Sequence, residues 1–135
     1  MSTFSSIEEA RAYFEGDRFA TENGMTLDEI GESSAVCSMT LTRRHQNANG
    51  GVMGGAIFTL ADFAFAVACN NVHRPTVALQ VSVNYFSPPK GDRLIARARL
   101  RRDGRTTCVY IVDVTDDTGR DVAQFVGTGY KVRTS

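Results

Sequence analysis

Alternating apolar and polar side chains mark much of this chain. In residues 34–41, Ala35, Cys37, Met39 and Leu41 alternate with polar neighbours, and Val36 alone breaks the period of two. Turn sequences, among them Asp-Gly at 103–104, separate several stretches of this kind. The pattern predicts strands over residues 25–30, 34–41, 76–86, 93–102, 106–115 and 121–132.

Sequence signals for helices lie before the first predicted strand and between the second and third. Ser6 and Glu9 have the spacing of a capping box, which predicts a helix from Ser6 to about Phe14, and Gly16 ends it. A second short turn is expected at residues 18–22. A polar loop, residues 43–51, separates the first two strands from the next helix.

The segment from Val52 to Asn71 is apolar on nearly every face of a helix. Asp62 is its only ionisable side chain between Val52 and Cys69. Such a helix is buried all round or spans a membrane. A short apolar run that opens with two glycines and carries a central carboxylate argues against the membrane. We therefore expect an α+β domain in which a curved antiparallel sheet wraps around one long central helix, the hotdog arrangement.

Length, charge and cysteine content narrow the class. The 135 residues suit one domain, with an N-terminal helical segment over 1–24 and a core over 25–132. The formal net charge is zero, which gives no support for nucleic-acid binding. An odd number of widely spaced cysteines and a first segment without signal-peptide features favour reduced thiols and the cytoplasm, with no membrane partner.

Asp62 is the first candidate for chemistry. A carboxylate on an apolar helix loses hydration, which costs several kcal/mol unless it is paired or protonated. Thr59, three residues earlier, is the one nearby side chain able to hydrogen-bond to it, and no basic residue lies within two turns. The position favours a functional group. The alternative is that Asp62 points to solvent through a gap in the sheet.

Gly54 and Gly55 form the second candidate. The first N–H groups of a helix lack intrahelical partners, and glycine allows a ligand to approach them, as an oxyanion would. Asp62 lies eight residues beyond Gly54, roughly 12 Å along the axis. One helix therefore cannot place both at one reacting atom. If both serve one reaction, Asp62 comes from a second copy, which predicts a two-fold dimer. Dimer or dimer of dimers is left open.

The motif around these residues resembles the hotdog thioesterases of the phenylacetate-degradation (PaaI-like) type. That family carries Asn, five residues, His-Gly-Gly, six residues, then Asp or Glu. Asn47, Met53-Gly54-Gly55 and Asp62 stand at these spacings, and the strand ending in Tyr85-Phe86-Ser87-Pro88 resembles the one after the family helix. The resemblance covers about residues 25–132.

The resemblance implies an acyl-CoA thioesterase. Asp62 would be the general base or nucleophile, the Gly54 N–H would polarise the thioester carbonyl, Asn47 would position the reacting group or water, and Gly55 would support the helix start. Coenzyme A would enter as part of the substrate, with no separate cofactor. Met53 stands where the family usually has His, so any role of that imidazole is absent.

Other polar residues have two interpretations. The arginines on and after the strand at 93–102 form a solvated face or a surface for coenzyme A phosphates, with Arg99, Arg101, Arg105 and Lys90 as candidates. His45 is expected to face solvent or to brace its loop rather than to act in catalysis, and no residue spacing indicates a metal site. Met53 and the phenylalanines Phe58, Phe63 and Phe65 line an acyl pocket or fill the core.

Two functions follow from different classes. The first is hydrolysis of an aryl- or medium-chain acyl-CoA, in which Asp62 activates water or attacks the carbonyl. The second is a non-catalytic protein that binds or senses acyl-CoA, and Met53 is the residue that favours it.

Overall fold

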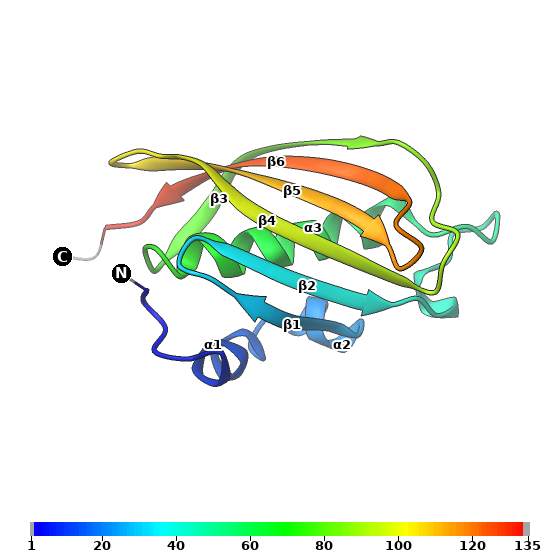
Figure 1. Cartoon of the computed structure of the whole chain (residues 1–135), viewed down its shortest axis with the longest axis horizontal. Coiled ribbons are helices and arrows are strands. Elements are labelled where there is room, and N and C mark those ends of the chain that lie inside the picture. Colours follow the sequence, from blue (N-terminus) through cyan, green and yellow to red (C-terminus); the bar gives the residue numbers. More distant parts are fainter. Residues whose placement is uncertain (1, 134–135) are drawn as a thin grey trace.

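The computed structural model describes residues 2–133 and arranges them as one curved sheet around one long helix (Figure 1). In chain order the elements are α1 (Ile7–Phe14), α2 (Arg18–Glu22), β1 (Met25–Ile30), β2 (Ser34–Thr40), a 3-10 turn η1 (Arg43–His45), α3 (Gly54–Asn70), β3 (Thr76–Tyr85), β4 (Arg93–Asp103), β5 (Thr107–Asp116) and β6 (Asp121–Lys131).

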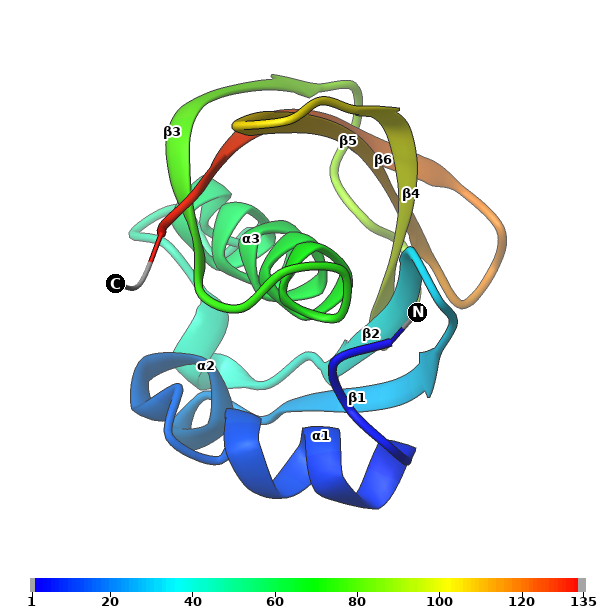
Figure 2. The same cartoon turned by 90° about the vertical axis from the view of Figure 1, so that its left-hand side faces the viewer.

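The sheet is antiparallel, in the order β1-β2-β4-β5-β6-β3, and its concave face encloses α3 (Figure 2). On α3, Phe65 packs edge-on against Tyr110 of β5, at 5.8 Å between ring centroids. It also packs in a tilted arrangement against Phe125 of β6, at 5.7 Å between ring centroids. The inward residues of β4 and β5, such as Leu94 and Val112, are fully buried. The predicted hotdog arrangement is confirmed.

The predicted element bounds hold to within one residue except at α3. That helix begins at Gly54, two residues later than the pattern predicts, because Val52 pairs with Gln46 in an isolated β-bridge and Met53 is the N-cap. Only one of the two hydrogen bonds of the predicted capping box forms at the start of α1. Ser6 accepts from the Glu9 N–H at 3.1 Å, but the Glu9 carboxylate bonds to Ser5 rather than to the cap residue.

The expectation that α3 is buried on every side is wrong for the chain alone. Gly55, Phe58, Thr59, Asp62 and Ala66 are exposed or only partly buried. Their spacing of three or four residues makes them one stripe along the helix. The sheet curls around α3 but does not close, and the side between β3 and α2 stays open (Figure 2).

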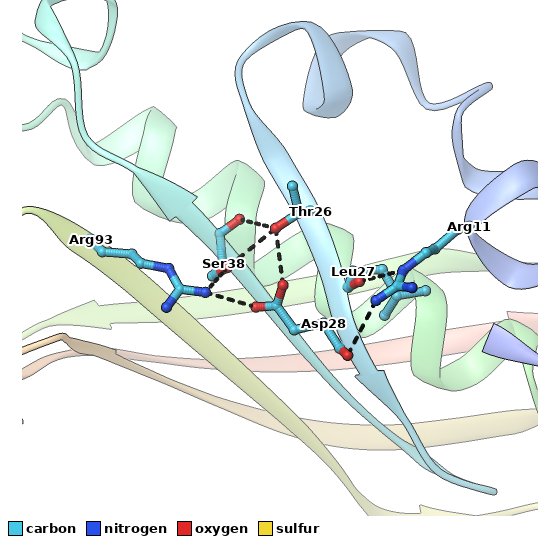
Figure 3. Close-up of polar contacts among 6 residues, drawn as sticks. All are labelled: Arg11, Thr26, Leu27, Asp28, Ser38 and Arg93. Atoms are coloured by element: carbon cyan, nitrogen blue, oxygen red, sulfur yellow. Dashed lines mark hydrogen bonds and ion pairs between the residues drawn. The ribbon is translucent and has the colours of Figure 1, made fainter. Parts of the chain in front are cut away.

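At the other side, the edge strand β1 is covered. Arg11 of α1 donates its Nε proton to the Leu27 carbonyl at 2.9 Å (Figure 3). On the outer face, Arg93 of β4 reaches across β2 to bind Ser38 Oγ at 2.7 Å and Asp28 Oδ2 at 3.3 Å (Figure 3). These contacts tie α1, β1, β2 and β4 together. Within residues 2–133, no helix is long and apolar enough to cross a membrane.

Candidate active site

The start of α3 is held from both sides. The Met53 N–H donates to the His45 carbonyl at 2.8 Å, and the Tyr85 hydroxyl at the end of β3 donates to the Gly54 carbonyl at 3.0 Å. The N–H groups of Gly54 and Gly55 have no acceptor among residues 2–133. The helix therefore presents two fixed, free donors at its positive end, which is the geometry that stabilises a developing oxyanion.

Close packing requires neither glycine at the start of α3. A Cβ on Gly54 would lie 3.4 Å from the Tyr85 ring, at ordinary contact distance. A Cβ on Gly55 would meet only Met53, at 3.6 Å, which is ordinary contact. Glycine costs about 1 kcal/mol relative to alanine within a helix. Packing therefore accounts for neither glycine, and glycine at both positions leaves the backbone donors accessible to a ligand.

Asp62 is partly buried on the open stripe of α3. It lines an opening beneath α2 together with Asp17, Arg18, Phe19 and other residues. Burial raises the pKa of the Asp62 carboxyl, and the nearby Asp17 charge raises it further. A raised pKa brings a carboxylate closer to the range in which a general base works at neutral pH. Because Asp62 is also partly exposed at this opening, the structure is consistent both with a functional carboxylate and with one that points to solvent through a gap in the sheet.

Thr59 does not serve Asp62 as proposed from the sequence. Its hydroxyl proton goes to the Gly55 carbonyl at 2.7 Å, back along the helix. A hydroxyl has one proton to donate, so Thr59 braces the first turn of α3 instead. Phe58 also proves to be a partial core residue, because its ring packs on Phe125 at 5.5 Å between centroids.

Asn47 holds the loop that leads into α3. Its Oδ1 accepts from the N–H groups of Asn49 at 2.9 Å and Gly51 at 3.1 Å. The side chain is exposed, and its oxygen is occupied by the loop. Any contact of Asn47 with a substrate or water would therefore come from its Nδ2 donor. The predicted positioning role of Asn47 stays a prediction.

His45 is buried and braces its loop, which confirms one of the two expected alternatives and shows that the solvent-facing one is wrong. Its Nδ1 accepts from the Thr42 N–H at 3.0 Å, so its Nε2 carries the proton and donates to the Asn23 carbonyl at 2.8 Å. Because its own carbonyl receives the Met53 N–H, His45 links the end of α2 to the start of α3. Sequence reasoning located this residue but gave no sign of that link.

The basic residues are divided between the two ends of the molecule. Arg99 and Arg101 lie on the exposed face of β4, where Arg99 pairs with Asp113 of β5, and Arg105 lies in the β4–β5 turn. That turn is beside Lys131 and hence the end of the sheet where α3 terminates. Within one chain these arginines are remote from Gly54. Their role toward coenzyme A stays a prediction.

Lys90 is nearer the helix start. It follows Pro89, which lines a surface pocket with Gly54, Tyr85 and Phe86. Its backbone N–H donates to Asp116 Oδ2 at 2.7 Å, which fixes the loop while the Lys90 side chain remains exposed. Among the predicted phosphate-binding residues, Lys90 is thus the one whose neighbour in sequence lines a pocket with Gly54 in the same chain.

Cysteine and metal chemistry receive no structural support. The three cysteines are free and buried, and burial raises the pKa of each thiol, which disfavours a nucleophilic thiolate. Among residues 2–133, no group of three or more His, Cys, Asp and Glu side chains has an arrangement able to hold a metal ion.

The sequence pattern did not reveal some of the residues that shape the candidate site. The Tyr85 hydroxyl fixes the Gly54 carbonyl, and the only sequence signal was an aromatic residue at the end of a strand. Arg44 and Phe19 line a pocket beside Gly55, although they are far from it in sequence. The sequence places Gly54 and Asp62 roughly 12 Å apart along the axis, and the uninterrupted helix α3 maintains that separation.

Comparison with known proteins defines the class. A family model described as the thioesterase superfamily matches residues 49–123, more than half of the chain and the whole of α3. The chain belongs to the thioesterase superfamily. The resemblance inferred from the Asn47, Gly54-Gly55 and Asp62 spacing is confirmed at the level of the family.

Individual relatives are consistent with this. The chain is 33% identical to the acyl-coenzyme A thioesterase PaaI of Escherichia coli K12, over 93% of this chain and 90% of that protein. The solved structure of E. coli PaaI matches with a TM-score of 0.89 at 31% identity, covering 96% of this chain and 94% of that one. The crystal structure of a hypothetical thioesterase protein from Streptococcus pneumoniae with coenzyme A matches with a TM-score of 0.81 at 27% identity, covering 88% of this chain and 96% of that one.

Proposed function

We propose that this protein is a thioesterase that hydrolyses acyl-CoA carrying an aryl or medium-chain acyl group, at a site completed by a second copy of the chain. The observation that carries the proposal is the pair of free N–H donors at Gly54 and Gly55 on the same helix as the partly buried Asp62. The acyl-CoA thioesterase activity of the E. coli relative and the coenzyme A in the S. pneumoniae structure support this substrate class.

The chemistry uses few groups. The thioester oxygen accepts a hydrogen bond from the Gly54 N–H, which stabilises the negative charge that develops on it. In one route the Asp62 carboxylate takes a proton from water as the hydroxide adds to the carbonyl carbon. In the other, Asp62 attacks directly, and water then cleaves the anhydride. In both, the C–S bond breaks and coenzyme A leaves as a thiolate, which takes a proton from the Asp62 carboxylic acid in the first route and from water in the second. Both routes remain open.

The partner copy is needed because of the separation along α3. The free edge of β3 supports a way to bring it in. Residues 77–80 of β3 are exposed, and Leu79 and Val77 expose 63% and 50% of their surface. Long exposed edges are normally protected in folded proteins. Antiparallel pairing of two β3 edges about a two-fold axis sets two α3 helices antiparallel, so that Gly54 of one faces Asp62 of the other.

Met53 favours the second candidate, a protein that binds acyl-CoA without cleaving it. It occupies the N-cap of α3, makes no side-chain cap hydrogen bond and is 55% exposed. In this position it adds apolar surface beside the thioester and no polar donor. We favour hydrolysis because the backbone donors and Asp62 do not depend on the residue at position 53. Both candidates take the same ligand, and we expect the protein to work in the cytoplasm.

The test is free-thiol release from a panel of aliphatic and aryl acyl-CoAs by wild type and Asp62→Asn. We expect turnover by wild type and a fall in kcat of roughly 10²- to 10⁴-fold in the variant, the usual contribution of a general acid or base. Asp121→Asn, a change of an exposed carboxylate at the start of β6, is the matched control. Binding of acyl-CoA with no turnover by wild type would overturn hydrolysis in favour of the binding protein.

A further inference from the structure

The Tyr85 hydroxyl acts on the start of α3 through the backbone. Tyr85 ends β3, and its register partner on β6 is the fully buried Ala123. The tyrosine ring lies against Gly54, where a Cβ would be 3.4 Å from it, and the hydroxyl is 3.0 Å from the Gly54 carbonyl oxygen. A carbonyl oxygen only accepts, so the hydroxyl is the donor in this bond.

This bond adds to those that the helix makes. A carbonyl oxygen has two lone pairs, so the Gly54 oxygen accepts from Tyr85 and still accepts along the helix axis. Among residues 2–133, the preceding carbonyl, on Met53, accepts from backbone N–H groups alone, those of Ala56 at 3.0 Å and Ile57 at 3.4 Å. At the start of α3, the Gly54 carbonyl is therefore the one to which a side chain donates.

The Gly54 carbonyl shares its peptide unit with one of the free donors. The carbonyl of Gly54 and the N–H of Gly55 belong to one planar group, so a bond that holds the oxygen also holds the direction of the N–H. Hydrogen bonds in a chain polarise one another, so a proton donated to the carbonyl makes the N–H a stronger donor. The Gly55 N–H has no acceptor among residues 2–133. The effect of Tyr85 is thus passed to a donor that is free to meet a ligand.

We infer that Tyr85 is a positioning residue of the oxyanion site, which orients and polarises the Gly55 N–H through the peptide between Gly54 and Gly55. The thioester oxygen then accepts from two N–H groups, and Tyr85 strengthens the second. This contribution grows as negative charge develops on the oxygen, so it acts mainly on the transition state. Partial burial raises the pKa of Tyr85, which keeps the hydroxyl proton in place at neutral pH. The inference rests on the thioesterase function proposed above.

The first test is Tyr85→Phe, which removes the hydroxyl and keeps the ring. In thiol release we expect kcat to fall roughly three- to tenfold, the factor that one ordinary hydrogen bond supplies, with KM nearly unchanged. Tyr13→Phe is the matched control. Tyr13 is exposed to nearly the same extent, 48% against 50%, and its ring packs on Phe4 and beneath Arg74, beyond the end of α3. The control should leave kcat and KM unchanged.

The second test reads the polarisation of the bound thioester directly. Octanoyl-CoA and benzoyl-CoA, isotopically labelled at the carbonyl carbon, are bound to Asp62→Asn with and without Tyr85→Phe, so that turnover is slow in both samples. A weaker Gly55 donor polarises the carbonyl less, so difference infrared spectra should show its stretch at higher wavenumber when the hydroxyl is absent. A merely structural role of Tyr85 would change the urea melt and leave the stretch where it was.

Two results would overturn the inference. One is a Tyr85→Phe variant with the kcat of wild type. The other is a fall in kcat while the carbonyl stretch stays in place, because Tyr85 would then only stabilise the helix start. Failure of the proposed function is distinct from both, since wild type itself would then release no thiol from any acyl-CoA, whichever residue occupies position 85.

Discussion

The two edges of the curved sheet differ in how they meet solvent. At β1, the residues that face outward are polar, α1 packs alongside, and Arg11 occupies the Leu27 carbonyl. At β3, the exposed residues include Val77 and Leu79. The same difference extends to α3, whose apolar surface is covered beneath β2, β4 and β5 but open beside β3. The chain protects one edge against association and leaves the other suited to it.

The open side is also where the candidate chemistry lies. Gly55, Thr59 and Asp62 belong to the stripe of α3 that the sheet leaves open. On the covered side, the polar groups pair with one another, as in the contacts of Arg93 with Ser38 and Asp28. This chain folds around one half of its central helix and leaves the other half open, where the proposed partner and substrate would bind.

The largest expected effect comes from a change to the open edge. Replacing Val77 and Leu79 together by lysine places like charges across the proposed β3–β3 contact and should convert the protein to a monomer. Because each site then lacks the partner's carboxylate, thiol release should fall by roughly a hundredfold or more. Light scattering during gel filtration reports the mass. Glu29→Lys at the β1 edge should leave mass and rate unchanged, and an active monomer of the double variant would refute the dimer.

The second largest effect is expected for Gly55, a glycine that close packing does not require. Gly55→Ala should raise the free energy of unfolding by up to about 1 kcal/mol, since alanine is the better helix former. It should also lower kcat/KM by roughly tenfold, because the methyl group displaces the acyl group from the helix donors. Urea melts and thiol release on the same sample check both. A variant that is more stable and fully active would remove Gly55 from the site.

A smaller effect is expected on the covered side. Arg11→Met keeps the apolar stem but loses the bond to the Leu27 carbonyl, which should cost about 1 kcal/mol of unfolding free energy. The assembly and the rate should not change. Arg102→Met, an exposed residue of β4, should shift stability by less than about 0.5 kcal/mol. A change of oligomeric state in Arg11→Met would mean that β1, too, contributes to association.

The smallest effect concerns the ionisation of Asp62. Burial and Asp17 raise its pKa in the folded chain, so between the ordinary carboxyl pKa and the raised one the folded state binds more protons than the unfolded state. Stability is therefore lost as pH rises through that window. Asp62→Asn should be slightly more stable than wild type at neutral pH, and the difference should disappear below about pH 4. Thermal melts across pH measure this, and equal profiles would contradict it.

Local patterns predict much of this fold from the sequence. The Ser6 cap, the period-two stretches and the glycine turns each depend on neighbours within a few residues, and these elements end within one residue of their expected bounds. The start of α3 was missed because the Gln46–Val52 bridge is a contact that apolar periodicity does not report. Likewise, apolar character on every face of α3 did not distinguish a surface covered by its own sheet from one left open.

The candidate site, too, has some features that the sequence predicts and others that only the fold creates. The spacing of Asn47, Gly54, Gly55 and Asp62 is a property of the sequence, and so is the separation that implies a partner. The role of Tyr85 at Gly54 depends on how β3 returns past the helix start, thirty-one residues along the chain. Phe19 reaches the pocket only through the packing of α2 on α3, which no local pattern specifies.

In the proposed enzyme, one site takes its donors from one copy of the chain and its carboxylate from the other. The direct measurement mixes two inactive variants, Asp62→Asn and Gly55→Leu, under conditions that exchange subunits. After random exchange, half of the dimers contain one copy of each variant. Each such dimer has one intact site and one doubly altered site. About a quarter of wild-type thiol release should therefore return. Mixed dimers verified by mass spectrometry that show no activity above the two parents would contradict the shared site.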